Sequence, residues 1–281
     1  MASRMFSGLL EAIDRGAFPR TRKWFWRRLY DMLSRSWRDS DWRFMNYGFL
    51  PPQPLFPLHE EDEPDRPFIG LYEQAVAGLP VAGAHVLEIG AGRGGGARYI
   101  ARHHRPASMT GLDYSPATVC LARQLNRDTP ALSFETGDAE KLPFPDGSID
   151  IVVNIESSHC YGDVAAFARE VARVLAPGGW FTFADMRGKA TLGELRRQLA
   201  APGLVLREET DLSRGVVAAL DAAESRKRER IASARFMRGF ISEFAGTKGS
   251  VLYRELAEGG VVYIAQRYQK QAVDRPGQIG A

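Results

Sequence analysis

Apolar runs alternate with helix-like stretches over most of this chain. Strands are expected at residues 84–89, 108–113, 132–138, 149–155, 180–185 and 261–269, the first being "AHVLEI" and the fourth "IDIVVNI". Helices are expected between them, for example at 67–79, 115–125 and 164–175. Apolar runs without alternation are typical of strands buried on both faces, so we expect a parallel sheet covered by helices, an α/β fold.

The two ends of this core differ from it in composition. The stretch "KWFWRRLYDMLSRSW" places Phe25, Leu29, Met32 and Leu33 at helical spacing and is followed by "LPPQPLFPLHEEDEPDRP", a segment too rich in proline for a helix. A helix-rich insertion is expected before the last strand. The predicted units are 1–66 (helical segment and linker), 67–190 (core), 191–258 (helical insertion over the acceptor site) and 259–281 (last strand and tail).

The net charge of +3 is unevenly distributed. Residues 1–50 hold ten Arg or Lys against five Asp or Glu, together with four of the five tryptophans. This segment is expected to form a lid or an interface of a homo-oligomer, and a membrane-surface helix is the less favoured alternative. The basic run "ESRKRER" is expected to be a solvated helix face. Two cysteines without C-x-x-C spacing and no long apolar stretch predict a cytoplasmic protein with reduced thiols.

The segment "VLEIGAGRGGG" carries the main functional signal, a strand followed by a glycine-rich turn. Such a turn in a parallel sheet binds ligands, but "GAGRGG" and an acid at Asp113 fit a dinucleotide as well as other nucleosides. Glu88 is unfavourable beside a pyrophosphate and suits a cationic group. Asp138 follows the third strand and suits an adenine amino group. Together these residues favour a zwitterionic nucleoside.

On these residues the sequence resembles class I S-adenosylmethionine-dependent methyltransferases, through "VLEIGAGRG", "GLDYS", "GDAEKLPFPDGSIDIVVNIES" and "REVARVLAPGGWFTFAD". The resemblance implies a Rossmann-like seven-stranded sheet in the order 3-2-1-4-5-7-6, with the last strand antiparallel. Further stretches, including "FMNYGF" and "NIESSHCYGDVAAFAREVARVLAPGGWF", resemble phthiotriol/phenolphthiotriol dimycocerosate methyltransferases and actinobacterial methyltransferases of mitosane- or teleocidin-type scaffolds. That similarity implies a small lipophilic acceptor from lipid or secondary metabolism.

The expected site follows from these segments. S-adenosylmethionine is expected to be held by Glu88, Gly90, Gly92, Gly94, Asp113, Tyr114, Asp138, Ala139, Glu156 and Tyr47. His159 is the expected base for O-methylation, because a histidine pKa near ~6.5 suits proton removal at neutral pH. The acceptor is expected to meet His159, Tyr161 and Asn46. Arg93 is expected to pair with the linker acids at 60–65 or with Glu88. For His159, Glu156, Tyr161 and Tyr47 a purely packing or backbone-bonding role stays open.

Other functions remain to be weighed. Carbon methylation of a terpenoid or alkene is the main mechanistic alternative, since aromatic faces shelter a carbocation. A nucleic-acid methyltransferase is disfavoured because "NIESSHCY" stands where the amino-methylating DNA enzymes place Asn/Asp-Pro-Pro-aromatic. A non-catalytic cofactor-binding protein and an NAD-type dehydrogenase are weaker hypotheses still. The scattered histidines predict no metal site.

Overall fold

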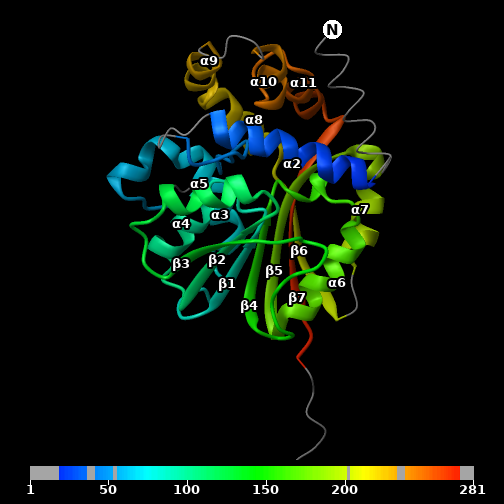
Figure 1. The fold of residues 1–281 in the computed structure, drawn as a ribbon. Coiled ribbons are helices and arrows are strands. Elements are labelled where there is room, and N and C mark those ends of the chain that lie inside the picture. The colour runs from blue at the N-terminus through cyan, green and yellow to red at the C-terminus, as the bar shows by residue number, and fades with distance from the viewer. Residues whose placement is uncertain (1–18, 37–41, 53–55, 201–202, 233–237, 273–281) are drawn as a thin grey trace, which may run out of the picture.

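A single seven-stranded sheet forms the centre of the molecule (Figure 1). The computed structural model describes residues 19–36, 42–52, 56–200, 203–232 and 238–272. The sheet order β3-β2-β1-β4-β5-β7-β6, with β7 antiparallel to both neighbours, confirms the expected fold. The strands are β1 (His85–Ile89), β2 (Ser108–Asp113), β3 (Leu132–Thr136), β4 (Ile149–Ile155), β5 (Leu175–Gly188), β6 (Leu204–Asp211) and β7 (Val261–Lys270).

Helices cover both faces of this sheet. The α-helices are α2 (Pro19–Ser36), α3 (Arg66–Val76), α4 (Gly95–His103), α5 (Pro116–Leu125), α6 (Val164–Val174), α7 (Leu192–Leu199), α8 (Ser213–Ala222), α9 (Glu224–Ala232), α10 (Arg238–Phe244) and α11 (Val251–Glu258). Short 3-10 turns are η1 (Glu60–Asp65), η2 (Ser158–Cys160) and η3 (Lys189–Thr191). Helix α5 begins as its sequence predicts, because the Ser115 side chain accepts from the Thr118 amide and Pro116 follows.

The strands bury side chains on both faces, as their unbroken apolar runs predict. In β4, Ile151 and Val153 join a core formed with α3, α4 and α5, whereas Val152 joins a second core formed with α6 and α7. All three are at most 1% exposed. Because successive strand residues point to opposite faces, this pattern fixes β4 at the middle of a three-layer structure.

The range 191–258 differs from its prediction as a helical insertion, because it contains the sheet strand β6 as well as α7 to α11. Strand β6 lies at the edge and reads "LVLREETD", and most of its residues are exposed. A strand at the edge of a sheet buries little apolar surface, so β6 lacks the unbroken run of apolar residues from which the other strands were predicted. The basic run of α9 is also not a uniformly solvated face. Lys227 Nζ donates to the Ala245 carbonyl at 2.9 Å, and burial lowers its pKa to about 8.

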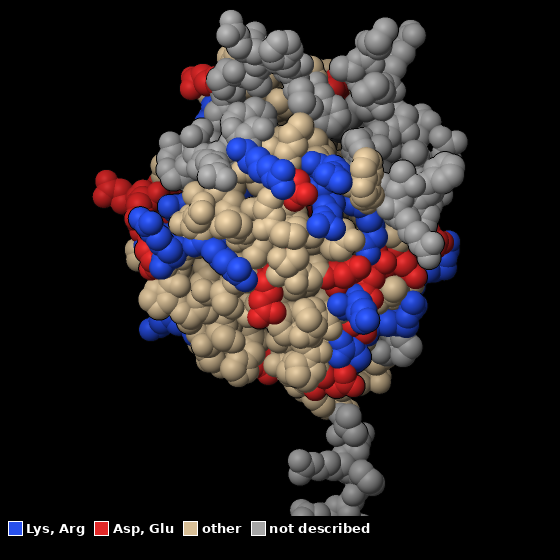
Figure 2. Space-filling view, viewed as in Figure 1, with Lys and Arg blue, Asp and Glu red and all other residues tan. Residues whose placement is uncertain are grey.

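Helix α2 crosses the carboxyl ends of the central strands (Figure 1). It is fixed to the start of α5, where the Ser34 and Thr118 hydroxyls lie 2.9 Å apart and Ser115 Oγ donates to Asp31. Arg28 and Arg35 of this helix are exposed, and basic side chains are visible on this part of the surface (Figure 2). The position of α2 over the carboxyl edge of the sheet agrees with the expectation that the N-terminal segment forms a lid. Residues 1–18 and Trp37 lie outside the described residues. In the part of the chain that is described, no helix is both long and apolar enough to cross a membrane.

Candidate active site

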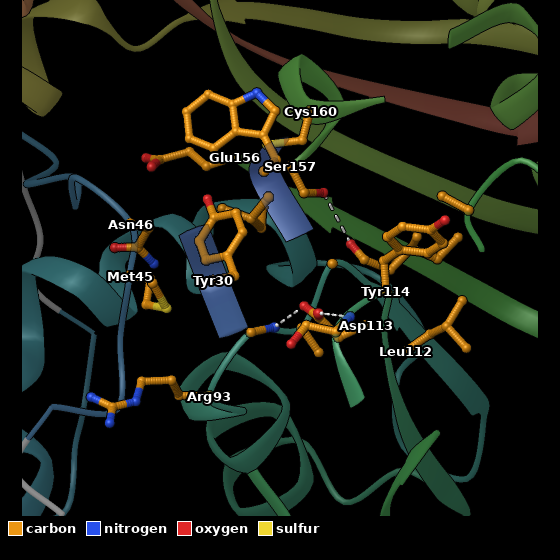
Figure 3. Close-up of a pocket in the computed structure, with 18 of the residues that line it drawn as sticks. Tyr30, Met45, Asn46, Arg93, Leu112, Asp113, Tyr114, Glu156, Ser157 and Cys160 are labelled. Carbon is orange, nitrogen blue, oxygen red and sulfur yellow. Dashed lines mark hydrogen bonds between the residues drawn. The ribbon is translucent and has the colours of Figure 1, made fainter. Parts of the chain in front are cut away.

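A cavity opens between α2 and the carboxyl ends of β1, β2 and β4 (Figure 3). Its empty volume is about 960 Å³, including space open to solvent. The position agrees with the rule that ligands bind at the carboxyl edge of an open sheet, where neighbouring crossovers leave on opposite faces. Helix α2 contributes one wall through Lys23, Trp26, Arg27 and Tyr30.

The glycine turn between β1 and α4 forms the floor. Gly90 has a φ of 79°, in the left-handed region where a side chain is disfavoured. A Cβ there would also lie 2.3 Å from Ser157 Oγ. A Cβ at Gly92 would instead meet only Met45 Sδ, at 3.7 Å, so the backbone of the turn is bare toward the cavity. Gly94 does not line the cavity; it is packed against the Phe134 ring and the Asn126 side chain.

Asp113 ends β2 beside this turn with a fixed orientation. Its Oδ2 accepts from the Gly92 amide at 3.0 Å and its Oδ1 from the Ser115 amide at 2.9 Å. Burial raises its pKa, and these amide donors partly oppose the shift. Tyr114 follows with 39% of its surface exposed, and it lines the cavity too. A carboxylate held in this way can accept two vicinal hydroxyls.

Asp138 and Ala139 lie on the loop after β3 and line the same end of the cavity. Asp138 Oδ1 accepts from the Glu140 amide at 2.9 Å. Both of its oxygens also accept from Lys23 Nζ of α2, at 2.8 Å each. The carboxylate expected to meet adenine therefore already contacts the lid helix.

Glu88 is fully buried and lies behind the wall of the cavity, not in its lining. Tyr72, which does line the cavity, donates its hydroxyl hydrogen to Glu88 Oε1 at 2.8 Å. Burial raises the pKa of Glu88 to about 8, although hydrogen bonds from Tyr72 and the Ala97 amide oppose the shift. This shift favours the protonated form of Glu88 at neutral pH in the absence of a cationic ligand.

This shift predicts a loss of stability as the pH rises. Between the ordinary Glu pKa of about 4.3 and the folded value near 8, the folded chain holds a proton that the unfolded chain has lost. Each pH unit in that window lowers the free energy of unfolding by at most about 1.4 kcal/mol. Glu88→Gln should flatten the decline of the melting temperature between pH 5 and pH 8, whereas Glu60→Gln, at an exposed position, should not. Parallel declines for Glu88→Gln and the native chain would contradict the assignment.

Glu156 projects into the cavity from the end of β4 (Figure 3). Its φ of 47° is strained for a residue with a side chain, a feature that clusters at functional sites. Its Oε1 accepts from the Tyr47 amide and the Tyr263 hydroxyl, both at 2.9 Å. Burial raises its pKa to about 8, against these hydrogen bonds. Tyr47 itself is buried outside the cavity lining, with Lys227 Nζ 5.9 Å from its ring centroid.

His159 lies in η2, between cavity-lining Ser157 on one side and Cys160 and Tyr161 on the other. Its Nδ1 is 3.1 Å from Oδ1 of Asp185, a fully buried residue of β5. Its own side chain is not part of the lining: it packs edge-on against Trp26, with ring centroids 5.6 Å apart. Burial lowers the pKa of His159, but the nearby Cys160 and Asp185 more than offset this and raise it well above the ordinary value, which differs from the near-neutral pKa expected from the sequence.

A polar network holds the loop after β4. Asn154 Nδ2 donates to Ser157 Oγ at 2.7 Å and to the Tyr161 hydroxyl at 2.8 Å, and these two hydroxyls lie 2.7 Å apart. Tyr161 therefore combines cavity contact with packing, the two alternatives that its sequence position left open. Asn46 enters from the opposite side, where its Nδ2 donates to the Phe68 carbonyl at 3.2 Å.

The structure thus brings together most of the residues expected from the sequence. Those that line one cavity are Gly90, Gly92, Asp113, Tyr114, Asp138, Ala139, Glu156, Tyr161 and Asn46. Glu88, Gly94, Tyr47 and His159 lie immediately behind that lining. Arg93 donates to the Trp42 carbonyl at 2.8 Å and lies over the Trp42 ring. The linker acids expected as its partners pair with other residues: Glu63 with Arg66, and Asp65 with Arg226.

Two important residues escaped the sequence analysis. Asp185 ends the run "WFTFAD" at a strand terminus, the same signal that marked Asp113, but its pairing with His159 spans 26 residues. Lys23 had no signal beyond a basic helix, since its partners Asp138 and Glu140 lie more than a hundred residues away.

The donor and acceptor groups of the site fit S-adenosylmethionine. The bare turn at Gly92 allows close approach, and Asp113 is a buried acceptor of the kind that suits ribose hydroxyls. Asn46 Oδ1 is buried and has no hydrogen-bond partner among the described residues, so it can accept from an ammonium group. Burial raises the pKa values of Glu88 and Glu156, and a bound cation nearby would lower them again. The ionised carboxylates would then attract that cation. Within the described ranges, no group of three or more His, Cys, Asp or Glu side chains is placed to bind a metal ion.

Comparison with known proteins agrees with this geometry. A methyltransferase domain model matches residues 87–183. A phthiotriol/phenolphthiotriol dimycocerosates methyltransferase of Mycobacterium tuberculosis is 35% identical over 92% of this chain and 96% of its own. A fatty-acid O-methyltransferase of Mycolicibacterium smegmatis is 38% identical over 95% of this chain and 98% of its own. The crystal structure of the [4+2]-cyclase SpnF matches 87% of this chain and 94% of its own, with a TM-score of 0.66 and 18% identity, which indicates a shared fold.

Proposed function

The chain belongs to the S-adenosylmethionine-dependent methyltransferases of lipid or natural-product type, and from that premise we propose that it methylates a hydroxyl oxygen of a small lipophilic acceptor. The names of the two curated relatives specify phthiotriol or phenolphthiotriol dimycocerosates in one case and a fatty acid, methylated at oxygen, in the other. Both are lipids, and this supports a lipophilic acceptor here.

The observation that carries the proposal is the pairing of His159 with Asp185. Asp185 accepts from the His159 amide at 3.2 Å as well as facing Nδ1 at 3.1 Å. It is itself held by Ser158 Oγ at 2.6 Å and lies 3.2 Å from Arg187 Nη1. An Nδ1–H directed at a carboxylate leaves Nε2 as the atom that takes a proton. A hydroxyl acceptor needs such a base, whereas a carboxylate does not, and neither does an alkene before methyl transfer.

Each wall of the cavity has a separate task in this mechanism. The bound cofactor supplies a methyl group on a sulfonium, which is open to in-line displacement. The glycine turn, Asp113 and Asp138 hold the nucleoside, and Glu156 with the loop after β4 positions the reacting end. Alignment of this kind supplies up to about 7–11 kcal/mol of barrier reduction. Helix α2 forms one wall of the cavity and limits the access of water to it.

The acceptor enters, in this proposal, between Trp26 and the loop after β4. Trp26 and Tyr30 both line the cavity next to Cys160, and their aromatic surfaces suit an apolar molecule. His159 lies directly behind Trp26, so a hydroxyl reaches Nε2 when the indole moves aside. The acceptor therefore displaces a side chain and meets a base that is shielded from water until then.

The atom methylated tests the proposal directly. Purified enzyme should be incubated with S-adenosylmethionine carrying a ¹³C methyl group and a long-chain 4-alkylphenol, and the product examined by carbon NMR. We expect an O-methyl resonance, because His159 removes the phenolic proton as oxygen attacks. A C-methyl resonance without any O-methyl product, on the phenol or on a terpenoid alkene offered in parallel, would contradict the proposal and favour carbon methylation.

A further inference from the structure

Lys23 is the charged residue through which α2 reaches the nucleoside end of the cavity. Its ammonium lies 2.8 Å from both oxygens of Asp138 and 3.1 Å from Glu140 Oε1. It also lies 5.2 Å from the centroid of the Tyr114 ring, which Arg27 approaches to 5.4 Å. One residue of the lid therefore contacts two acids and one aromatic ring of the expected adenine subsite.

We propose that Lys23 is a positioning residue that holds α2 closed over a bound cofactor and thereby sets the rate of cofactor release. The inference rests on the proposed position of the cofactor in this cavity. It assigns to Lys23 neither a proton transfer nor a contact with the acceptor.

The position of Lys23 on α2 explains why its contact has consequences elsewhere. Lys23, Trp26, Arg27 and Tyr30 are spaced i, i+3, i+4 and i+7, so they share one face of the helix, and all four line the cavity. The same face packs Trp26 against His159. Because α2 is a single helix, the contact of Lys23 with Asp138 and Glu140 also fixes the positions of Trp26 and Tyr30. These two aromatic residues lie at the end of the cavity where methyl transfer is proposed to occur.

The ion pair is strong enough to act in this way because it is largely shielded from water. The side chains of Lys23 and Glu140 are 17% and 18% exposed, respectively. Burial lowers the pKa of Lys23, but its hydrogen bonds to Asp138 and Glu140 outweigh this and raise it, so the ammonium keeps its charge at neutral pH. Exposed ion pairs contribute little to stability, whereas this partly buried pair with two acceptors keeps its attraction at moderate ionic strength and is screened only at high salt.

Glu140 offers a way to remove the charge without disturbing the loop. Its Oε1 also accepts from the Gly162 amide at 2.7 Å and from the Asp163 amide at 3.2 Å. The amide oxygen of Gln can keep both hydrogen bonds, so Glu140→Gln removes only the attraction for Lys23. Lys141 is exposed on the same loop and serves as a matched control.

The test measures association and dissociation of S-adenosylhomocysteine on the immobilised full chain by surface plasmon resonance. We expect Lys23→Met to raise the dissociation rate constant about tenfold, since breaking one partly buried pair weakens closure by roughly a factor of ten. Glu140→Gln should raise it less, because the pair with Asp138 remains. The double variant should match Lys23→Met, because the interaction that Glu140→Gln removes is already lost when Lys23 is replaced. Lys141→Met should stay within about twofold of the native chain.

Salt provides an independent arm of the same experiment. Raising the ionic strength to about 1 M, where the Debye length is about 3 Å, should speed dissociation from the native chain more than from Lys23→Met. An unchanged dissociation rate in Lys23→Met would overturn the proposal. So would a faster association rate alone, which would mean that Lys23 only competes with adenine for Asp138. Absence of binding by the native chain would instead refute the cofactor site itself.

Discussion

Replacing His159 with Ala is expected to lower the turnover number by about 10²–10⁴-fold, the usual contribution of a positioned general base. The affinity for S-adenosylhomocysteine should change by less than about twofold, because His159 lies behind the cavity lining and touches no expected cofactor atom. The measurement combines initial rates on the long-chain 4-alkylphenol with calorimetric titration of the product nucleoside. Turnover that survives in His159→Ala with an unaltered pH profile would exclude His159 as the base.

The pH dependence of the rate tests the same prediction a second time, because its direction is also expected. The charged and titratable groups that face His159 are Asp185, Cys160, Glu156 and, beyond Asp185, Arg187. Of these, Cys160 and Asp185 raise the pKa of His159 well above the ordinary value of about 6.5, against the lowering effect of burial. A base works only when deprotonated, so the rate should rise with pH through neutrality and level off above that pKa.

Asp185→Asn serves as the companion variant. Without the carboxylate, the pKa of His159 falls toward its ordinary value, and the rising limb of the profile moves to lower pH. The rate on the plateau should fall as well, because an amide no longer fixes the Nδ1–H tautomer. A purely structural role for Asp185 would lower the rate at every pH without moving the limb.

Replacing Gly90 with Ala is expected to weaken binding of S-adenosylhomocysteine by at least about 100-fold, or about 2.7 kcal/mol. The new Cβ would lie 2.3 Å from Ser157 Oγ and 2.4 Å from Ser157 Cβ. Ser157 cannot yield easily, since its hydroxyl is held by Asn154 Nδ2 at 2.7 Å and by the Tyr161 hydroxyl at 2.7 Å. The turn must therefore move into the space that the cofactor needs, as titration calorimetry will show.

Gly83 supplies the matched control for that variant. Its φ of 76° resembles the 79° of Gly90, but a Cβ at Gly83 meets nothing within 4 Å. Gly83→Ala should therefore show only the backbone strain, roughly 1 kcal/mol of stability, with cofactor affinity preserved. Equal losses of affinity in the two variants would mean that strain, not the contact with Ser157, governs the turn.

The sequence by itself determined the strands that are buried on both faces. It also determined the acidic and glycine residues at the carboxyl ends of these strands. Unbroken apolar runs specify such strands because both faces need covering, and the acids and glycines that follow them converge at one edge of a parallel sheet. Gly90, Asp113 and Asp138 were found by that rule and do line one cavity. Strand β6 was missed because an edge strand carries no such pattern.

Only the tertiary structure decided which distant residues meet. Asp185 reaches His159 because β4 and β5 are neighbours in the sheet, and Lys23 reaches Asp138 because α2 folds back over the carboxyl edge. The structure also placed Glu88 behind Tyr72, outside the lining that the sequence suggested. Local sequence sets periodicity and turn chemistry, whereas contacts across a hundred residues depend on packing between layers. Such contacts leave no mark in any short stretch of the chain.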